Sequence, residues 1–147
     1  MNKTLQKSKP RGTKNNLPAW DLSDLYQGMT DKQIEKDLAV YQKSAEAFAK
    51  KYKGKIAQLS PKQFFEMAQE CEERSVLGNK LGVFAYLTMV TQMKNREAMA
   101  FYQNISEKLT DYSKPTIFLS LEINQLPQDK IDTWLKDKKA AYFAPWV

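Results

Sequence analysis

The stretch SPKQFFEMAQECEERSVLGNKLGVFA, residues 60–85, decides the fold of this chain. Ser60 is a typical helix N-cap, Pro61 suits the first turn, and Gln63 completes a capping box. The helix predicted to follow has one face of small residues at steps of three and four: Ala68, Cys71, Ser75, Gly78, Gly82 and Ala85. Because a glycine inside a helix costs roughly 1 kcal/mol relative to alanine, we expect another backbone to approach this face closely.

A long helix is also predicted before this segment. Thr30 is its expected N-cap and Gly54 its expected end. Between them, apolar residues at steps of three and four keep a single buried face: Ile34, Leu38, Tyr41, Ala45, Phe48 and Tyr52. This periodicity is typical of an amphipathic helix of more than five turns.

A third long helix is predicted downstream, with Asn95 as its N-cap. Its apolar register passes through Pro115 without a shift, which predicts one helix bent at that proline. After Pro127, a short helix is expected to carry Ile131, Trp134 and Leu135. With only 5 Gly and 6 Pro in 147 residues, the sequence predicts an all-α fold, an antiparallel bundle of long helices or helical hairpins.

The charge of the chain is concentrated in its first residues. Residues 1–16 contain five basic side chains and no acid, and we expect them to form a disordered, solvated arm. Removing these five from the 23 Lys and Arg of the whole sequence leaves 18 basic side chains against 17 acidic ones in residues 17–147. A nucleic-acid-binding domain needs a basic stripe on its folded part, so no nucleic-acid partner is expected.

Two further features of the sequence bear on the location of the protein in the cell. The single cysteine, Cys71, has no partner for an internal disulfide, which favours a reducing compartment and a place in the core. The longest apolar stretch, residues 81–93, is interrupted by polar residues and is too short to span a bilayer. The expected location is cytoplasmic, with no membrane association.

The sequence contains no histidine. Hydrolytic zinc sites usually use imidazole ligands, and Ser-type catalytic triads need one imidazole. The chain is therefore not expected to be an enzyme by itself, and no catalytic, cofactor-binding or metal-binding residue is predicted in it.

Several segments, in order, resemble one peptidase family. Trp20-Asp21-Leu22-Ser23-Asp24-Leu25-Tyr26 resembles the opening signature of the oligoendopeptidase F family of zinc metallopeptidases. A Lys-rich helix and Leu59-Ser60-Pro61 follow, as in that family. Residues 118–126 are similar to its F-x-x-x-E-(I/L) stretch, and Tyr142-Phe143-Ala144-Pro145-Trp146 to its Y-x-x-(W/F) region. The resemblance covers the chain from Leu17 onward, but only the N-terminal part of a family member.

The resemblance implies an all-helical N-terminal domain, residues 17–147, whose zinc-dependent catalytic domain is missing. Members of this family cleave short peptides in a channel between two lobes, and the zinc is held by H-E-x-x-H and a downstream Glu. None of these positions exists here, so the chain is expected to cover the substrate channel and to be inactive alone. The apolar run 142–147 is expected either to dock on the domain or to mark the point where a longer protein would continue.

A catalytic peptidase fragment or domain is the expected partner. The residues predicted to contact it, or another helix, are the small-residue face and the end of the sequence: Ala68, Cys71, Ser75, Gly78, Gly82, Ala85, Trp146 and Val147. The alternative interpretation is a stand-alone helical interaction module that binds a partner helix along residues 68–85.

Overall fold

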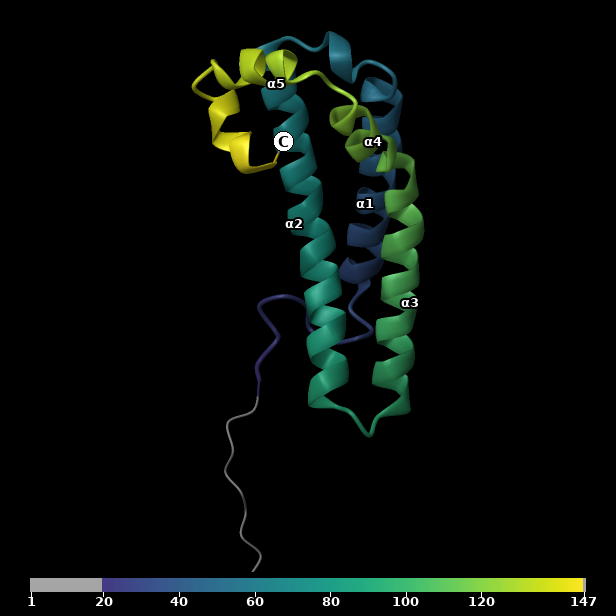
Figure 1. The fold of residues 1–147 in the computed structure, drawn as a ribbon. Coiled ribbons are helices and arrows are strands. Elements are labelled where there is room, and N and C mark those ends of the chain that lie inside the picture. Colours follow the sequence, from purple (N-terminus) through teal and green to yellow (C-terminus); the bar gives the residue numbers. More distant parts are fainter. Residues whose placement is uncertain (1–19, 147) are drawn as a thin grey trace, which may run out of the picture.

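A computed structural model describes residues 20–146 of the chain. The expectations for the basic arm, residues 1–16, and for Val147 lie outside these residues. Three long helices, α1 (Lys32–Tyr52), α2 (Pro61–Thr91) and α3 (Arg96–Ser113), run antiparallel to their neighbours in the sequence (Figure 1). No strand occurs among the described residues, so the predicted all-α fold class is confirmed.

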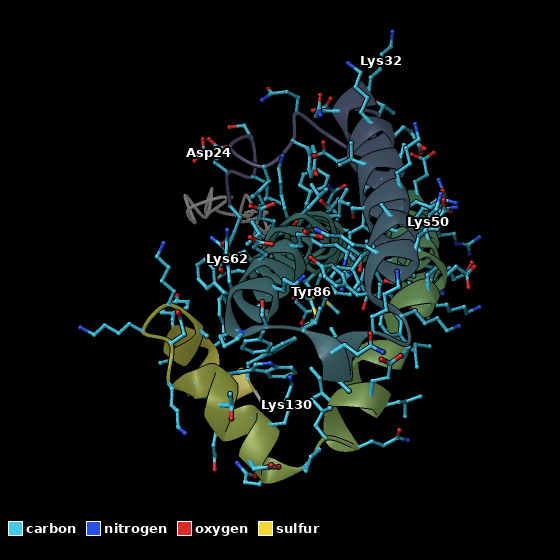
Figure 2. The ribbon with its side chains drawn as sticks, turned by 90° about the horizontal axis from the view of Figure 1, so that it is seen from above. Asp24, Lys32, Lys50, Lys62, Tyr86 and Lys130 are labelled. Carbon is cyan, nitrogen blue, oxygen red and sulfur yellow. The ribbon has the colours of Figure 1, made fainter. Side chains whose placement is uncertain are left out.

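Shorter helices cap one end of this bundle. They are α4 (Phe118–Asn124), α5 (Gln128–Leu135) and three 3-10 helices, η1 (Ile56–Gln58), η2 (Lys114–Thr116) and η3 (Ala140–Trp146). All lie near the end at which α2 begins (Figure 1). Figure 2 shows the bundle from above, with the exposed Lys32 of α1 extending away from it.

The helix ends follow the predicted capping chemistry in two of three cases. Ser60 and Gln63 form the predicted capping box of α2, and the side chain of Asn95 accepts a hydrogen bond at the start of α3. The prediction of Thr30 as the cap of α1 is wrong. Asp31 caps this helix, because its carboxylate accepts hydrogen bonds from the backbone N–H groups of both Gln33 and Gln27.

The predicted bend at Pro115 is a break in α-helical hydrogen bonding. The backbone stays right-handed helical from Lys114 to Ile117, so the apolar register continues as expected. However, Pro115 has no N–H to donate, and the 3-10 turn η2 separates α3 from α4. This turn lets α4 leave the line of α3 and cover the end of the bundle (Figure 1).

Two hydrophobic clusters lie at opposite ends of α2. The lower core, at the end where α2 meets α3, contains Tyr26, Ile34, Leu38, Leu81, Phe84, Ala85 and Ile105. The upper core joins the first half of α2 to the ends of α1 and to all the short helices except η2; it contains Phe48, Tyr52, Ile56, Leu59, Phe64, Met67, Ala68, Cys71, Phe118, Leu119, Ile123, Trp134, Ala140 and Phe143.

Trp134 anchors the C-terminal helices to the upper core. It is fully buried and stacks on Phe64, with ring centroids 4.4 Å apart. Its indole N–H donates to the carbonyl oxygen of Leu59 at 2.9 Å. Lys130, which points from α5 toward the centre of the molecule in Figure 2, donates to the same oxygen at 3.0 Å. The predicted short helix after Pro127 is thus confirmed, and its tryptophan faces the core.

Replacing Trp134 by alanine should lower the free energy of unfolding by about 3–5 kcal/mol, the usual loss for a buried large aromatic side chain. Trp134→Phe is the matched control, because it keeps one ring on Phe64 while removing the N–H donor and part of the ring system, for a smaller loss made of about 1 kcal/mol for the hydrogen bond plus the cost of the cavity. Urea unfolding followed by far-UV circular dichroism measures both. Equal losses in the two variants would show that the stack on Phe64 contributes nothing.

Candidate functional site

The small-residue face of α2 divides into two parts. At Gly78, an added Cβ atom would lie 2.9 Å from Cε2 of Tyr41 on α1, and at Gly82 it would lie 3.5 Å from Cδ1 of Leu109 on α3. Ala85 is buried in the lower core. These three positions therefore pack against helices of the same chain. The close approach at Gly78 is made by a tyrosine ring and not, as expected, by a backbone.

The other part of this face is open. Ala68, Cys71 and Ser75 line one side of a cleft of about 380 Å³, and η3 forms the other side. We call it the η3 cleft; its lining residues are Ala68, Cys71, Glu72, Ser75, Tyr142, Phe143, Pro145 and Trp146. The structure thus brings together four of the predicted contact residues, Ala68, Cys71, Ser75 and Trp146, and separates them from Gly78, Gly82 and Ala85.

A second cleft of about 330 Å³ lies on the other side of Trp146, between α2 and α4. It shares Cys71, Ser75 and Trp146 with the η3 cleft and is more polar, since Arg74, Thr116, Ser120 and Asn124 also line it. The Arg74 guanidinium lies over the ring of Phe48, with Cζ 4.9 Å from the centroid. The hydroxyl groups of Thr116 and Ser120 already donate to backbone carbonyls.

The cysteine that the two clefts share is not activated. Burial raises the pKa of the Cys71 thiol to about 11, so the thiol stays protonated near neutral pH and is a poor nucleophile. Among residues 20–146, no group of three or more cysteine and carboxylate side chains could hold a metal ion. The sequence supplies no imidazole either. The residues present therefore do not fit a zinc site.

The segment with the family signature folds against the lower core. Asp21 accepts from the backbone N–H of Ser23, and Tyr26 is buried with its ring 5.0 Å from that of Phe84. Leu22 and Leu25 pack against the same cluster. Trp20 does not pack with them, since 71% of its surface is exposed. The signature thus contributes three side chains to folding and leaves its tryptophan free of the core.

Sequence reasoning missed a buried polar network beneath this segment. The Tyr26 hydroxyl donates to Oδ2 of Asp37 at 2.7 Å, and Nζ of Lys80 lies 3.3 Å from the same oxygen. Gln33 donates to the other carboxylate oxygen. Burial opposes ionisation of Asp37, but these hydrogen bonds and the Lys80 charge outweigh it and hold its pKa below the ordinary value of 3.8. The signal in the sequence was an acid at the helical position beside Leu38.

The outer face of α2 was missed as well. Val76, Val83 and Tyr86 are exposed there, although the Tyr86 ring also packs edge-to-face against Tyr102 of α3, with centroids 6.0 Å apart. The spacing of seven between Val76, Val83 and Val90 could have indicated it.

The described residues thus define an all-α domain with two neighbouring clefts. No protein-family model, curated protein or solved structure matches the chain significantly. In the part of the chain that the structure describes, no helix combines the length and apolar character needed to cross a bilayer.

The two glycines of α2 should respond differently to alanine. Gly82→Ala should raise the free energy of unfolding by up to about 1 kcal/mol, because it gains helix propensity and its Cβ meets Leu109 at an ordinary 3.5 Å. Gly78→Ala should gain less or lose stability, because the ring of Tyr41 must move. Thermal and urea unfolding compare the two. Equal gains would mean that Tyr41 is not held against Gly78.

Asp37→Asn should lower the free energy of unfolding at neutral pH by about 1–2 kcal/mol, since a charged acceptor is lost from a buried network. The folded-state pKa of Asp37 lies below 3.8, so folding favours the carboxylate. This stabilisation is complete above the unfolded-state pKa and is lost as the pH falls through the folded-state pKa. The stability gap between the two proteins should therefore narrow below about pH 4, as measured by urea unfolding across acid pH. A gap that stays constant would exclude ionised Asp37 as its source.

Proposed function

We propose that this chain is the N-terminal, non-catalytic helical domain of an oligoendopeptidase F-like zinc peptidase. In this role it covers one side of a channel that admits short peptides. The zinc and the hydrolytic residues belong to a catalytic peptidase domain or fragment, which is the partner. The domain itself binds no metal and cleaves no peptide.

The proposal rests on the positions of the exposed aromatic side chains. Four aromatic side chains are exposed among residues 20–146, and three of them, Trp20, Tyr142 and Trp146, lie in segments that resemble the family. Trp20 and Tyr142 have 71% and 70% of their surface exposed. Tyr142 and Trp146 line the same cleft, exposed apolar patches are typical of interaction sites, and tryptophan and tyrosine supply much of the energy of protein interfaces.

The two exposed segments lie along the same helix. Trp20 shares a surface depression with Phe84, Thr88 and Thr91 of α2, while η3 borders the other half of α2 at Ala68 and Ser75. A partner domain that contacts both segments must extend along α2. Such a long contact suits a lobe that lies beside a catalytic lobe and covers a channel between them.

A second candidate is the stand-alone interaction module that binds a partner helix. The exposed apolar residues on the outer face of α2 favour it, because an amphipathic partner helix can cover such a face. Its binding site differs from that of the first candidate. The groove predicted for it, residues 68–85, is filled at Gly78, Gly82 and Ala85 by packing within the chain, so the exposed Val76, Val83 and Tyr86 would take its place. Binding there is independent of the catalytic domain.

The experiment is a binding and activity assay with the catalytic domain of an oligoendopeptidase F family member that lacks its own N-terminal domain. Alone, the present chain should not hydrolyse a quenched fluorescent pentapeptide, with or without added zinc. Mixed with that domain, it should bind and change the rate, and a chelator should abolish the activity. Trp20→Ala should weaken binding about tenfold or more, as expected for an interface tryptophan.

Met99→Ala is the matched control, because Met99 is an exposed apolar residue of α3 outside the family-like segments. It should bind like the unmodified chain. Chelator-sensitive hydrolysis by the chain alone, or the absence of any binding to the catalytic domain, would contradict the proposal.

A further inference from the structure

Arg74 of α2 is a cation whose partner the described part of the chain does not supply. Its Nη1 atom is buried and has no hydrogen-bond partner among residues 20–146, and the ion pairs found in this range do not include Arg74. Glu70, one turn earlier on α2, already accepts from Lys51 and Tyr52. Because nearly all buried polar groups in folded proteins are hydrogen-bonded, this guanidinium points to an acceptor that binds from outside.

Arg74 lies between two depressions that differ in charge. On one side is a groove between α1 and α2, which two acids and another base also line: Glu70, Glu73 and Lys51. On the other side is the cleft of about 330 Å³ between α2 and α4, which we call the α4 cleft; Arg74 is the only charged residue among those that line it. An anion is therefore favoured in the α4 cleft, where no lining carboxylate repels it.

We propose that the α4 cleft binds the C-terminal carboxylate of a short peptide at Arg74, and that the η3 cleft takes the apolar side chain of the last peptide residue. The ring of Phe48 lies under the guanidinium, with Cζ 4.9 Å from the centroid. Stacking of this kind leaves the N–H groups in the guanidinium plane free, and two of them match the two oxygens of a carboxylate.

The polar residues of the α4 cleft favour a peptide over a simple organic acid. The hydroxyl groups of Thr116 and Ser120 donate to backbone carbonyls, so their oxygens remain available as acceptors. The side chain of Asn124, in the same cleft, can both donate and accept. A peptide end offers amide N–H groups and carbonyl oxygens beside its carboxylate, and thus pairs with both kinds of group.

The η3 cleft suits the side chain and not the carboxylate. Tyr142, Phe143 and Trp146 give it an aromatic wall, and the acid Glu72 borders it, which disfavours a second negative charge there. The two clefts share Cys71 and Trp146, so a carboxylate and a side chain on the same Cα atom can reach one cleft each. Their volumes, about 380 and 330 Å³, are together within the range of small-ligand sites.

This inference goes beyond the proposed function and does not rest on it, because the site is formed by this chain alone. Peptide binding is measured without a catalytic domain, and the catalytic-domain test is made at Trp20. A negative result in either experiment therefore leaves the other unaffected.

The first experiment is isothermal titration calorimetry of the full chain with acetyl-Ala-Ala-Leu carrying a free carboxylate. Binding should be saturable with one site per chain. The C-terminal amide of the same peptide should bind about tenfold more weakly or worse, because the charged acceptor for Arg74 is lost. Acetyl-Ala-Ala-Gly should also lose about tenfold, because no side chain enters the η3 cleft.

The second experiment compares two variants that each remove one positive charge. Arg74→Gln should weaken binding of the free acid about tenfold or more and should no longer distinguish it from the amide. Arg96→Gln is the matched control, because Arg96 is exposed at the start of α3, at the end of the bundle opposite α4 (Figure 1); it should bind within about twofold of the unmodified chain. Circular dichroism checks that both variants fold.

A third variant, Arg74→Lys, keeps the charge but not the planar pair of donors, and should bind more weakly than the unmodified chain and more tightly than Arg74→Gln. Equal affinity for the acid and the amide, or equal losses in Arg74→Gln and Arg96→Gln, would overturn the proposal. So would tighter binding of the amidated peptide acetyl-Ala-Leu-Glu, which would make an acidic side chain the ligand. Binding that appears only after deletion of Val147 would identify this chain's own carboxylate as the occupant and would overturn it too.

Discussion

The length of α2 is the constraint on which the rest of the structure depends. At 31 residues, this helix is about 46 Å long, while α1 has 21 residues and α3 has 18. One layer of side chains cannot cover it from end to end, and the fold uses two cores. The lower core is closed by the Tyr26 segment, and the upper core by α4, α5 and η3. Both clefts border η3 on the first half of α2.

The starts of α2 and α3 could be predicted from the residues next to them. Ser60, Pro61 and Gln63 specify the start of α2 by contacts within four residues, and Asn95 does the same for α3. The N-cap of α1 could not be predicted in this way, because two neighbouring residues, Thr30 and Asp31, are both suitable. Asp31 replaces the expected Thr30 because its carboxylate also accepts from Gln27, and that bond exists only once the preceding loop has folded. The exposure of Trp20 could not be predicted for the same reason, since nothing local distinguishes it from the buried Tyr26.

The candidate site shows the same limit. The predicted approach of a backbone to the small-residue face is wrong at Gly78 and Gly82, where side chains approach instead, and sequence spacing does not say which element supplies them. At Gly78 and Gly82 it is α1 and α3 of the same chain. At Ala68, Cys71 and Ser75 it is η3, whose position follows from the Trp134 anchor on Phe64. A contact that depends on a stack between residues 70 positions apart leaves no periodic signal, so the η3 cleft could not be predicted.

The aromatic side chains on which the proposed function rests are held at the surface by the two cores. Trp20 stays exposed beside the lower core although Tyr26, six residues later, is buried in it. At the other end of α2, the Trp146 ring lies 6.4 Å from Phe64, which itself stacks on Trp134. The fold thus fixes the position of η3 while leaving Tyr142 and part of Trp146 exposed. Residues 17–147 carry 18 basic and 17 acidic side chains, so net-charge repulsion does not oppose contact with a partner, and apolar contact area would decide the affinity.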